Sequence, residues 1–236
     1  MRRASRVDAV EPFLAMEVLE RAIVLESGGA HVVHLEIGEP DFPPPAEVVL
    51  ACTRALEAGE TRYTDSRGLR ALREAIVEDH ARRHGEAVDP DRVLVTSGTS
   101  AAMLLVFSLL VEPGDEVIVP TPHYPCYPNF VRVCGGVPVF VPTGGADGFR
   151  VDVDAVRRAR TRRTAAIVFG SPANPTGAVQ DRDTVTALAA LGVPLVSDEI
   201  YDGLVYDGLA VSSALGAGDE VFVLDGFSKR YAMTGF

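Results

Sequence analysis

Short segments rich in Val and Ile alternate with helical stretches from residue 92 onward, and this alternation limits the possible folds more than any other feature of the 236-residue chain. Strands separated by helices of this length pair in parallel, because only a long crossover brings the next strand back in the same direction. We therefore expect an α/β fold, a mostly parallel sheet between two helical layers. The expected strands are 92–96, 116–120, 137–141, 165–169, 193–197 and 221–225.

The residues before this pattern are expected to be helical. Residues 11–27 place apolar and charged side chains at helical spacing and end at Gly28-Gly29, which predicts a helix within an N-terminal arm over residues 1–30. Two more helices are expected, from the prolines at 43–45 to about Leu56 and from Leu69 to Arg83. Residues 31–236 then form one large domain.

The charge and hydropathy of the chain exclude two classes of partner. With 22 basic against 33 acidic residues the net charge is −11, which argues against a nucleic-acid partner. The longest apolar run, Ala101 to Val111, is shorter than the roughly 20 residues that span a membrane. Asp8 and Glu11 occur before the apolar core of a signal peptide could form. We expect a cytoplasmic protein.

Cysteine and histidine give no metal site. Cys52, Cys126 and Cys134 are irregularly spaced without a CxxC pair, so buried thiols are expected. His80 and His84 share a helical face but lack the intervening Glu of a metalloprotease helix. Because their surroundings are rich in Arg, we expect a solvated helix face there.

The basic residues are 21 arginines and a single lysine, Lys229. Arginine cannot replace lysine where a neutral amine must attack a carbonyl, because its guanidinium stays protonated and delocalised. A sole lysine in such a chain favours a chemical role, although a surface lysine that is there by chance remains the alternative.

Polar residues gather where the expected strands end. Ser97-Gly98-Thr99-Ser100 leaves one strand and enters a helix, whose free N–H groups suit an anion such as phosphate, although Ser and Thr are also ordinary helix caps. Asn174-Pro175-Thr176-Gly177, Asp198-Glu199-Ile200-Tyr201 and Ser228-Lys229 follow later strands. Each has a structural alternative as turn, cap, core or solvated loop. Ligands of parallel sheets bind at this edge.

These motifs together closely resemble those of class I/II aminotransferases, which depend on pyridoxal 5'-phosphate and have the fold called type I. The resemblance runs from about residue 31 to the end of the chain. It rests on seven motifs in order: Gly38-Glu39-Pro40-Asp41, Tyr63-Thr64 with Gly68-Leu69-Arg70, Ser97 to Ser100, Pro122-His123-Tyr124-Pro125, Asn174 to Gly177, Asp198 to Tyr201 and Ser228-Lys229.

The resemblance implies a role for each polar residue at the strand ends. Lys229 would hold the cofactor as a Schiff base and move the proton between substrate and cofactor. Asp198 would pair with the pyridine nitrogen and keep it protonated, so that the ring can accept electrons. Asn174 and Tyr201 would donate hydrogen bonds to the phenolate oxygen of the ring.

The same resemblance implies contacts with the ring face and the phosphate. Tyr124 would stack on the ring. Thr99 and Ser100 would bind the phosphate from the helix N-terminus, and Ser228 would add a hydroxyl.

It also implies a shared site and a substrate contact. Tyr63 would reach the phosphate of a neighbouring subunit, which makes the protein a homodimer. Gly38 and Asn174 would lie at the carboxylate of the amino-acid substrate. The bonds Thr121-Pro122 and Asn174-Pro175 fall where the family has cis peptides.

The chain departs from the family pattern after Phe236. The resemblance implies a further antiparallel strand between segments 92–96 and 221–225, an arginine for the phosphate, and a small C-terminal domain. We therefore expect an incomplete large domain, and we expect these 236 residues alone to be unstable or inactive, because unpaired backbone groups in a buried sheet are costly.

Three readings of function follow from the resemblance. The leading one is transfer of an amino group from an L-amino acid to a 2-oxo acid. A carbon-sulfur β-lyase or a decarboxylase would use the same cofactor on the same fold. The non-enzymatic alternative is an inactive fragment or a ligand-sensing module.

Overall fold

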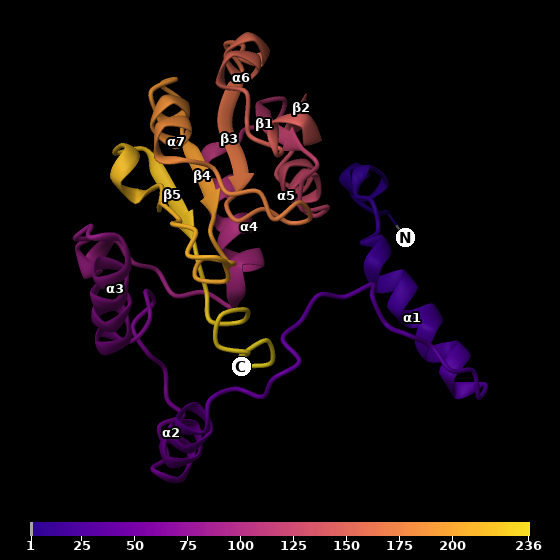
Figure 1. Ribbon diagram of the computed structural model, residues 1–236, viewed down its shortest axis with the longest axis vertical. Coiled ribbons are helices and arrows are strands. Elements are labelled where there is room, and N and C mark those ends of the chain that lie inside the picture. Colours follow the sequence, from indigo (N-terminus) through magenta and orange to yellow (C-terminus); the bar gives the residue numbers. More distant parts are fainter. Residues whose placement is uncertain (1) are drawn as a thin grey trace.

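Five parallel strands form one sheet in residues 2–236, the part of the chain that the computed structural model describes (Figure 1). The sheet order is β2-β1-β3-β4-β5, and every neighbouring pair is parallel. The expected α/β fold is thus confirmed. The strands are β1 (Glu116–Thr121), β2 (Val137–Pro142), β3 (Thr164–Gly170), β4 (Leu195–Asp198) and β5 (Val221–Leu224).

Helices cover both faces of this sheet. On one face, α4 (Gly98–Leu110) and α5 (Tyr127–Val133) bury side chains such as Phe107 and Val131 against Val117 and Val168. On the other face, α6 (Val153–Ala159) and α7 (Arg182–Ala189) bury Val156 and Leu188 against Ile118 and Ile167. Successive strand residues point to opposite faces, so strands that are covered on both sides are apolar at most positions.

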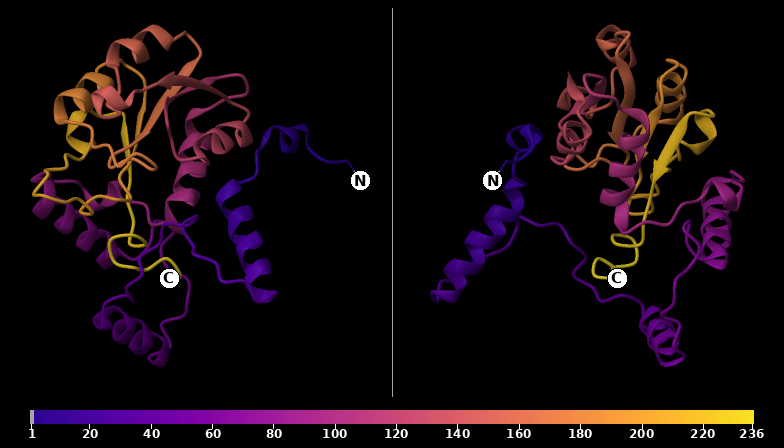
Figure 2. Two further views of the ribbon diagram at one scale, coloured as in Figure 1. Left: turned by 45° about the vertical axis from the view of Figure 1, so that its right-hand side comes forward. Right: turned by 180° about the vertical axis from the view of Figure 1, so that it is seen from behind.

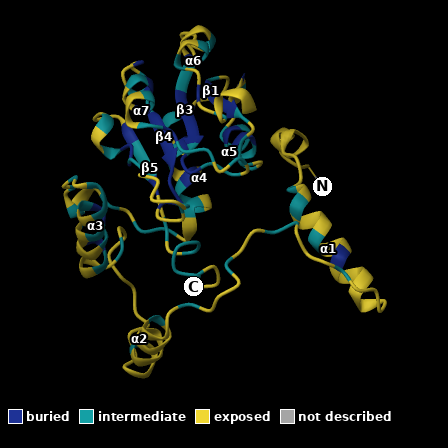
Figure 3. Cartoon of the chain, viewed as in Figure 1, coloured by how far each residue is buried: buried dark blue, intermediate teal, exposed yellow. Residues whose placement is uncertain are grey.

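The N-terminal helices lie outside these layers. α1 (Leu14–Ser27) and α2 (Ala46–Glu57) stand away from the sheet in all views (Figures 1 and 2), whereas α3 (Arg70–His84) lies beside its β5 edge. Figure 3 shows α1 and α2 as mostly exposed, and apolar residues such as Leu14 (65% exposed) and Leu56 (62%) are among their exposed side chains. Short 3-10 turns lie at Ser5–Ala9, Pro90–Arg92, Gly145–Asp147 and Leu215–Ala217.

The N-terminal segment is attached to the domain at α5. The backbone N–H of Glu11 donates to Oδ1 of Asn129 at 3.0 Å, and Arg132 pairs with the Glu11 carboxylate at 3.1 Å. Arg6 donates to the carbonyl of Val133 at 3.1 Å. These polar contacts fix residues 6–11 against α5, and α1, which follows them, projects from the domain.

The strand expected over 92–96 is wrong. Residues 93–96 are extended but not paired in the sheet, and the N–H of Val95 donates to the carbonyl of Arg67 at 3.0 Å instead. A segment forms a strand only when a neighbouring strand accepts and donates its backbone hydrogen bonds. β5 is the last strand on its side of the sheet, and no strand of the described residues joins it to segment 93–96.

Two further expectations about single residues are wrong. His80 is only 7% exposed and the His84 side chain 5%, so this face of α3 is buried rather than solvated. The cysteines are not buried thiols, since Cys52 is exposed and Cys126 and Cys134 are partly exposed. In the described residues, no helix is long and apolar enough to cross a membrane.

Candidate active site

Asp198 ends β4 and is the buried carboxylate of the site, with 6% of its surface exposed. The phenol of Tyr127 donates to its Oδ2 at 2.8 Å, and the N–H of Ile200 donates to its Oδ1 at 3.3 Å. Burial raises the pKa of Asp198, whereas these two hydrogen bonds lower it. A carboxylate placed in this way is suited to hold an N–H or a cationic group of a ligand.

Tyr127 reaches Asp198 because the neighbouring strand leaves room for its ring. Tyr127 comes from the start of α5 and is 3% exposed. A Cβ atom on Gly170, the last residue of β3, would lie 3.2 Å from the Tyr127 hydroxyl. Burial and the nearby Asp198 raise the pKa of Tyr127 well above its ordinary value, so the phenol stays protonated and acts as a donor.

Tyr201 and Asn174 form a second polar pair at the same edge. The Asn174 amide donates to the Tyr201 hydroxyl at 3.5 Å. Burial raises the pKa of the half-buried Tyr201 and Asp198 adds to the shift, while the bond from Asn174 lowers it. Both groups can therefore donate hydrogen bonds to an oxygen of a ligand at neutral pH.

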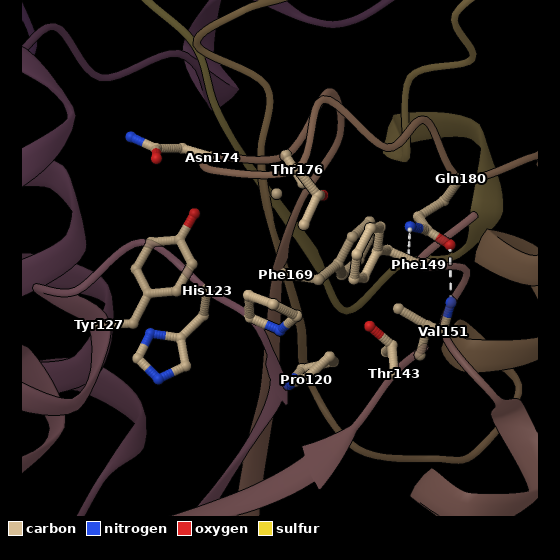
Figure 4. A pocket seen from close by; sticks show the side chains of 13 residues that line it. Pro120, His123, Tyr127, Thr143, Phe149, Val151, Phe169, Asn174, Thr176 and Gln180 are labelled. Carbon is tan, nitrogen blue, oxygen red and sulfur yellow. Dashed lines mark hydrogen bonds between the residues drawn. The ribbon is translucent and has the colours of Figure 1, made fainter. Parts of the chain in front are cut away.

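Gln180 joins the loop that carries Asn174 to the segment at Val151 (Figure 4). Gln180 is 2% exposed; its amide oxygen accepts from the N–H of Val151 at 2.9 Å, and its own N–H donates to Ser171 Oγ at 3.0 Å. In Figure 4, Asn174 and Tyr127 lie at one end of a small pocket and Gln180 at the other. The cis bonds Thr121-Pro122 and Asn174-Pro175 occur as expected, and Ser171-Pro172 is also cis.

Lys229 lies close to the expected substrate residue Gly38. Its Nζ donates to the carbonyl of Gly38 at 3.0 Å, a contact between residues 191 positions apart. The residue follows β5 in the segment after Leu224, and β5 is the direct neighbour of β4. The segment that carries the single lysine therefore leaves the sheet next to the strand that ends at Asp198.

The N-terminus of α4 offers an anion site at this edge. Ser97, the residue before the helix, makes no capping hydrogen bond through its side chain, and Thr99 and Ser100 belong to the first turn. A Cβ atom on Gly226 would lie 4.0 Å from Thr99 and 3.0 Å from Ile200, so the absence of a side chain brings the chain after β5 close to this turn. The first N–H groups of a helix attract phosphate.

Tyr124 is near the site and Tyr63 is not. The Tyr124 ring meets those of Phe13 and Tyr127 edge-on, at centroid distances of 5.9 and 5.4 Å. Burial, Cys126, Asp198 and Tyr201 raise the pKa of Tyr124. Tyr63 is fully exposed, at 107% of the reference area, and contributes nothing to the site of its own chain.

These groups fit pyridoxal phosphate. The buried carboxylate of Asp198 suits a pyridine N–H, the donors Asn174 and Tyr201 suit a phenolate oxygen, and the uncapped α4 suits a phosphate. The amine of Lys229 is the nucleophile that an aldehyde requires.

Comparison with known proteins identifies the family. The sequence model of the aminotransferases of class I and II matches residues 30–236. This chain belongs to that family. Its fold agrees with solved family members: aspartate aminotransferase from Thermus thermophilus with maleate superposes with a TM-score of 0.94 at 42% identity, over 100% of this chain and 63% of that chain.

Related aminotransferases differ in the substrates in their names. Aspartate/prephenate aminotransferase of Thermus thermophilus is 43% identical over 98% of this chain and 61% of its own length. The (5-formylfuran-3-yl)methyl phosphate transaminase of Methanocaldococcus jannaschii is 41% identical over 96% of this chain and 60% of its own length. The chain therefore spans about 60% of the length of these aminotransferases.

Two buried residues near the strand ends were missed by the sequence analysis. Tyr127 is separated from Tyr124 by two residues, and nothing in that spacing shows that its hydroxyl reaches Asp198. Glu199 is 2% exposed and accepts from Ser197 Oγ at 2.9 Å and from the Ala214 N–H at 2.8 Å. Burial raises the pKa of Glu199 to about 7, although these bonds oppose the shift.

Replacing Tyr127 by Phe should raise the pKa of Asp198 further, because the charged carboxylate loses its phenol donor. Leaving the buried carboxylate without this donor should also lower the free energy of unfolding by about 1–3 kcal/mol. The titration can be followed by 13C NMR of labelled aspartate, with the Asp198 signal assigned through Asp198→Asn. The exposed Tyr206→Phe is the control, and an unchanged Asp198 titration in Tyr127→Phe would show that the bond is unimportant.

Replacing Glu199 by Gln should make stability less dependent on pH. The folded state holds a proton on Glu199 up to about pH 7 against a reference value of 4.5, so this stabilisation is present below 4.5 and is lost as the pH rises through 7. Gln stays neutral and therefore lacks this loss. The free energy of unfolding in urea of Glu199→Gln, relative to that of wild type, should rise by roughly 3 kcal/mol between about pH 5 and pH 8. Exposed Glu57→Gln is the control; parallel pH curves for wild type and Glu199→Gln would contradict the assignment.

Proposed function

We propose that this chain is the cofactor-binding part of a pyridoxal-phosphate-dependent aminotransferase that moves an amino group from an L-amino acid to a 2-oxo acid. The observation that carries the proposal is that the single lysine follows β5, the neighbour of the strand that the buried Asp198 ends, and that its Nζ lies 3.0 Å from the carbonyl of Gly38. Family membership supports the cofactor, and the polar groups at the edge supply a partner for each part of it.

The cofactor supplies an aldehyde for the amine and a ring that accepts the electrons of the substrate Cα–H bond. Lys229 would hold the aldehyde end of the cofactor through Nζ, and the same amine would hold or release a proton beside the substrate. Asp198 would accept a hydrogen bond from the ring nitrogen, and its negative charge would favour the protonated nitrogen. The Tyr127 donor holds the Asp198 carboxylate in place for this contact.

The remaining residues orient the cofactor. Asn174 and Tyr201 donate to the phenolate oxygen, and Tyr124 stacks on the ring. The N–H groups and hydroxyls of Thr99 and Ser100, together with the hydroxyl of Ser228, bind the phosphate.

The assembly proposed is a homodimer with shared active sites, in which Tyr63 reaches the phosphate of the neighbouring subunit. The complete exposure of Tyr63 and the exposed apolar side chains of α1 and α2 support a partner at these surfaces. Gly38 and Asn174 are proposed to contact the substrate carboxylate. Amino acids and 2-oxo acids are therefore the small-molecule partners.

Borohydride reduction of the chain after incubation with pyridoxal phosphate should leave a pyridoxyl group on Lys229, because reduction makes the carbon–nitrogen bond permanent. Peptide mass mapping locates the adduct. Lys229→Arg is the control, since it keeps the charge and removes the nucleophile; the N-terminal amine is then the only other aliphatic amine in the chain. A folded protein without an adduct at Lys229 would refute the proposal.

Replacing Asp198 by Asn should leave cofactor binding largely intact and lower amino transfer roughly 100-fold or more, because a neutral amide cannot hold the proton on the ring nitrogen. Cofactor retention is measured by absorbance after gel filtration, and transfer by the formation of a new amino acid from a 2-oxo acid. Release of ammonia without an added 2-oxo acid would favour a lyase instead. Where wild type transfers the amino group at a measurable rate, an equal rate for Asp198→Asn would contradict the role of Asp198.

A further inference from the structure

One face of α3 carries charged and polar residues toward the turn that follows Asp198. Of the α3 residues, all of which the structure describes, those buried are Arg73 and His80, with no apolar side chain among them. Figure 3 shows the helix as exposed on much of its surface. Polar contacts therefore help to hold α3 at this edge of the domain, beside the partly buried Leu72 and Ile76, which line a hollow with Phe227 and Tyr231.

The centre of these contacts is Asp202, the residue after Tyr201. Nε2 of His84 lies 2.8 Å from Oδ2 of Asp202, and each side chain is 5% exposed. Arg83 forms an ion pair with the same carboxylate. Two adjacent residues of α3 thus bind the turn that carries Tyr201.

The same network reaches the segment that carries Lys229. Arg83 pairs with Asp225 at 3.2 Å, and with Asp79 at 2.7 Å. Arg230, the residue after Lys229, lies 3.6 Å from Asp79. A Cβ atom on Gly203 would lie 3.1 Å from Nε of Arg230, so the turn after Tyr201 and the segment after Lys229 also pack directly on each other.

A second polar contact joins α3 to the buried end of this turn. Nε2 of His80 lies 3.1 Å from Oγ of Ser213, whose neighbour Ala214 donates its N–H to Glu199 at 2.8 Å. The rings of His80 and His84 lie 4.7 Å apart. Residues 199–203 are therefore joined to α3 directly at Asp202 and indirectly, through Ser213 and Ala214, at Glu199.

Burial and the neighbouring charges set the protonation of the groups in this network. Burial, His80 and Arg83 lower the pKa of His84 to about 4, with Arg230 adding to the shift and Glu86 opposing it, so His84 is neutral at physiological pH. Burial alone would raise the pKa of Asp79, but Arg83, Arg230 and Arg82 bring it below its ordinary value. Burial raises the pKa of Asp225. Arg83 is thus the cation around which three carboxylates are arranged.

We propose that Arg83, His84 and Asp202 are positioning residues, which lock the turn of Tyr201 and the segment of Lys229 to α3 and so fix the phenol and the amine relative to each other. The effect on catalysis rests on the proposed function. The attachment of the two segments to α3, called the lock below, does not. None of these three residues touches the groups assigned to the cofactor or the substrate, so their effect passes through Tyr201 and Lys229.

Hydrogen exchange tests the lock without any cofactor. Asp202→Asn should speed exchange about tenfold or more at the N–H groups of Leu204 and Tyr231, which donate to Tyr201 and Phe227, because the lost carboxylate charge releases both segments. Exchange in α7 should not change. Asp207→Asn, the same charge change on an exposed residue of the same loop, is the matched control.

The bound cofactor gives a second, spectroscopic readout. If Tyr201 is displaced, the phenolate oxygen loses a donor, and the pH midpoint of the cofactor absorption should rise in Asp202→Asn but not in Asp207→Asn. If wild type binds no cofactor, the proposed function fails while hydrogen exchange still decides the lock. If the cofactor binds but exchange and midpoint match wild type, the lock is wrong and the proposed function stands.

Arg83→Lys keeps the test decisive if Asp202→Asn does not fold. A single ammonium keeps the charge but cannot reach three carboxylates as a guanidinium does, so it should give a smaller increase in exchange at the same N–H groups. In Arg83→Lys/Asp202→Asn the two increases should not multiply, because both changes break one interaction. Wild-type exchange in Arg83→Lys, or independent effects in the double variant, would overturn the proposal.

Discussion

Parallel pairing of the strands is the constraint on which the site depends. When strands run in one direction, their carboxyl ends meet at one edge, and the loops that leave it lie side by side whatever their distance in the sequence. Asp198 ends β4, and the segment that carries Lys229 follows β5, the neighbouring strand. Asn174 follows β3, the neighbour of β4 on the other side, and so belongs to the same edge.

The buried carboxylate at this edge is costly, and the surrounding residues offset that cost. A charge without partners in the interior would favour its neutral form, as the raised pKa of Asp198 shows. Tyr127 and the N–H of Ile200 stabilise the charged form, and Gly170 provides the room that Tyr127 needs. The hydrogen bonds of one strand end thus depend on a glycine in the next strand.

The sequence predicted the strands, the helical layers and the polar residues at the strand ends, because periodicity and turn residues are local signals. It failed for features that depend on contacts between residues far apart in the sequence. The spacing of His80 and His84 shows that they share a helical face, but it does not show that Asp202 and Ser213 lie opposite. Tyr127 was missed for the same reason. The expected strand at 92–96 failed because pairing depends on a neighbour and not on the segment itself.

The contrast between Lys229 and the arginines around it shows how composition and structure combine. Arg83 holds three carboxylates at once, which a guanidinium does well because it is planar, always charged and has several donors. Lys229 carries the only side-chain amine, which donates to one backbone carbonyl. A chain that uses arginine for its ion pairs and keeps one lysine at the carboxyl edge of its sheet has separated the two tasks. Arginine fixes the segments in place, and the amine is left free to react.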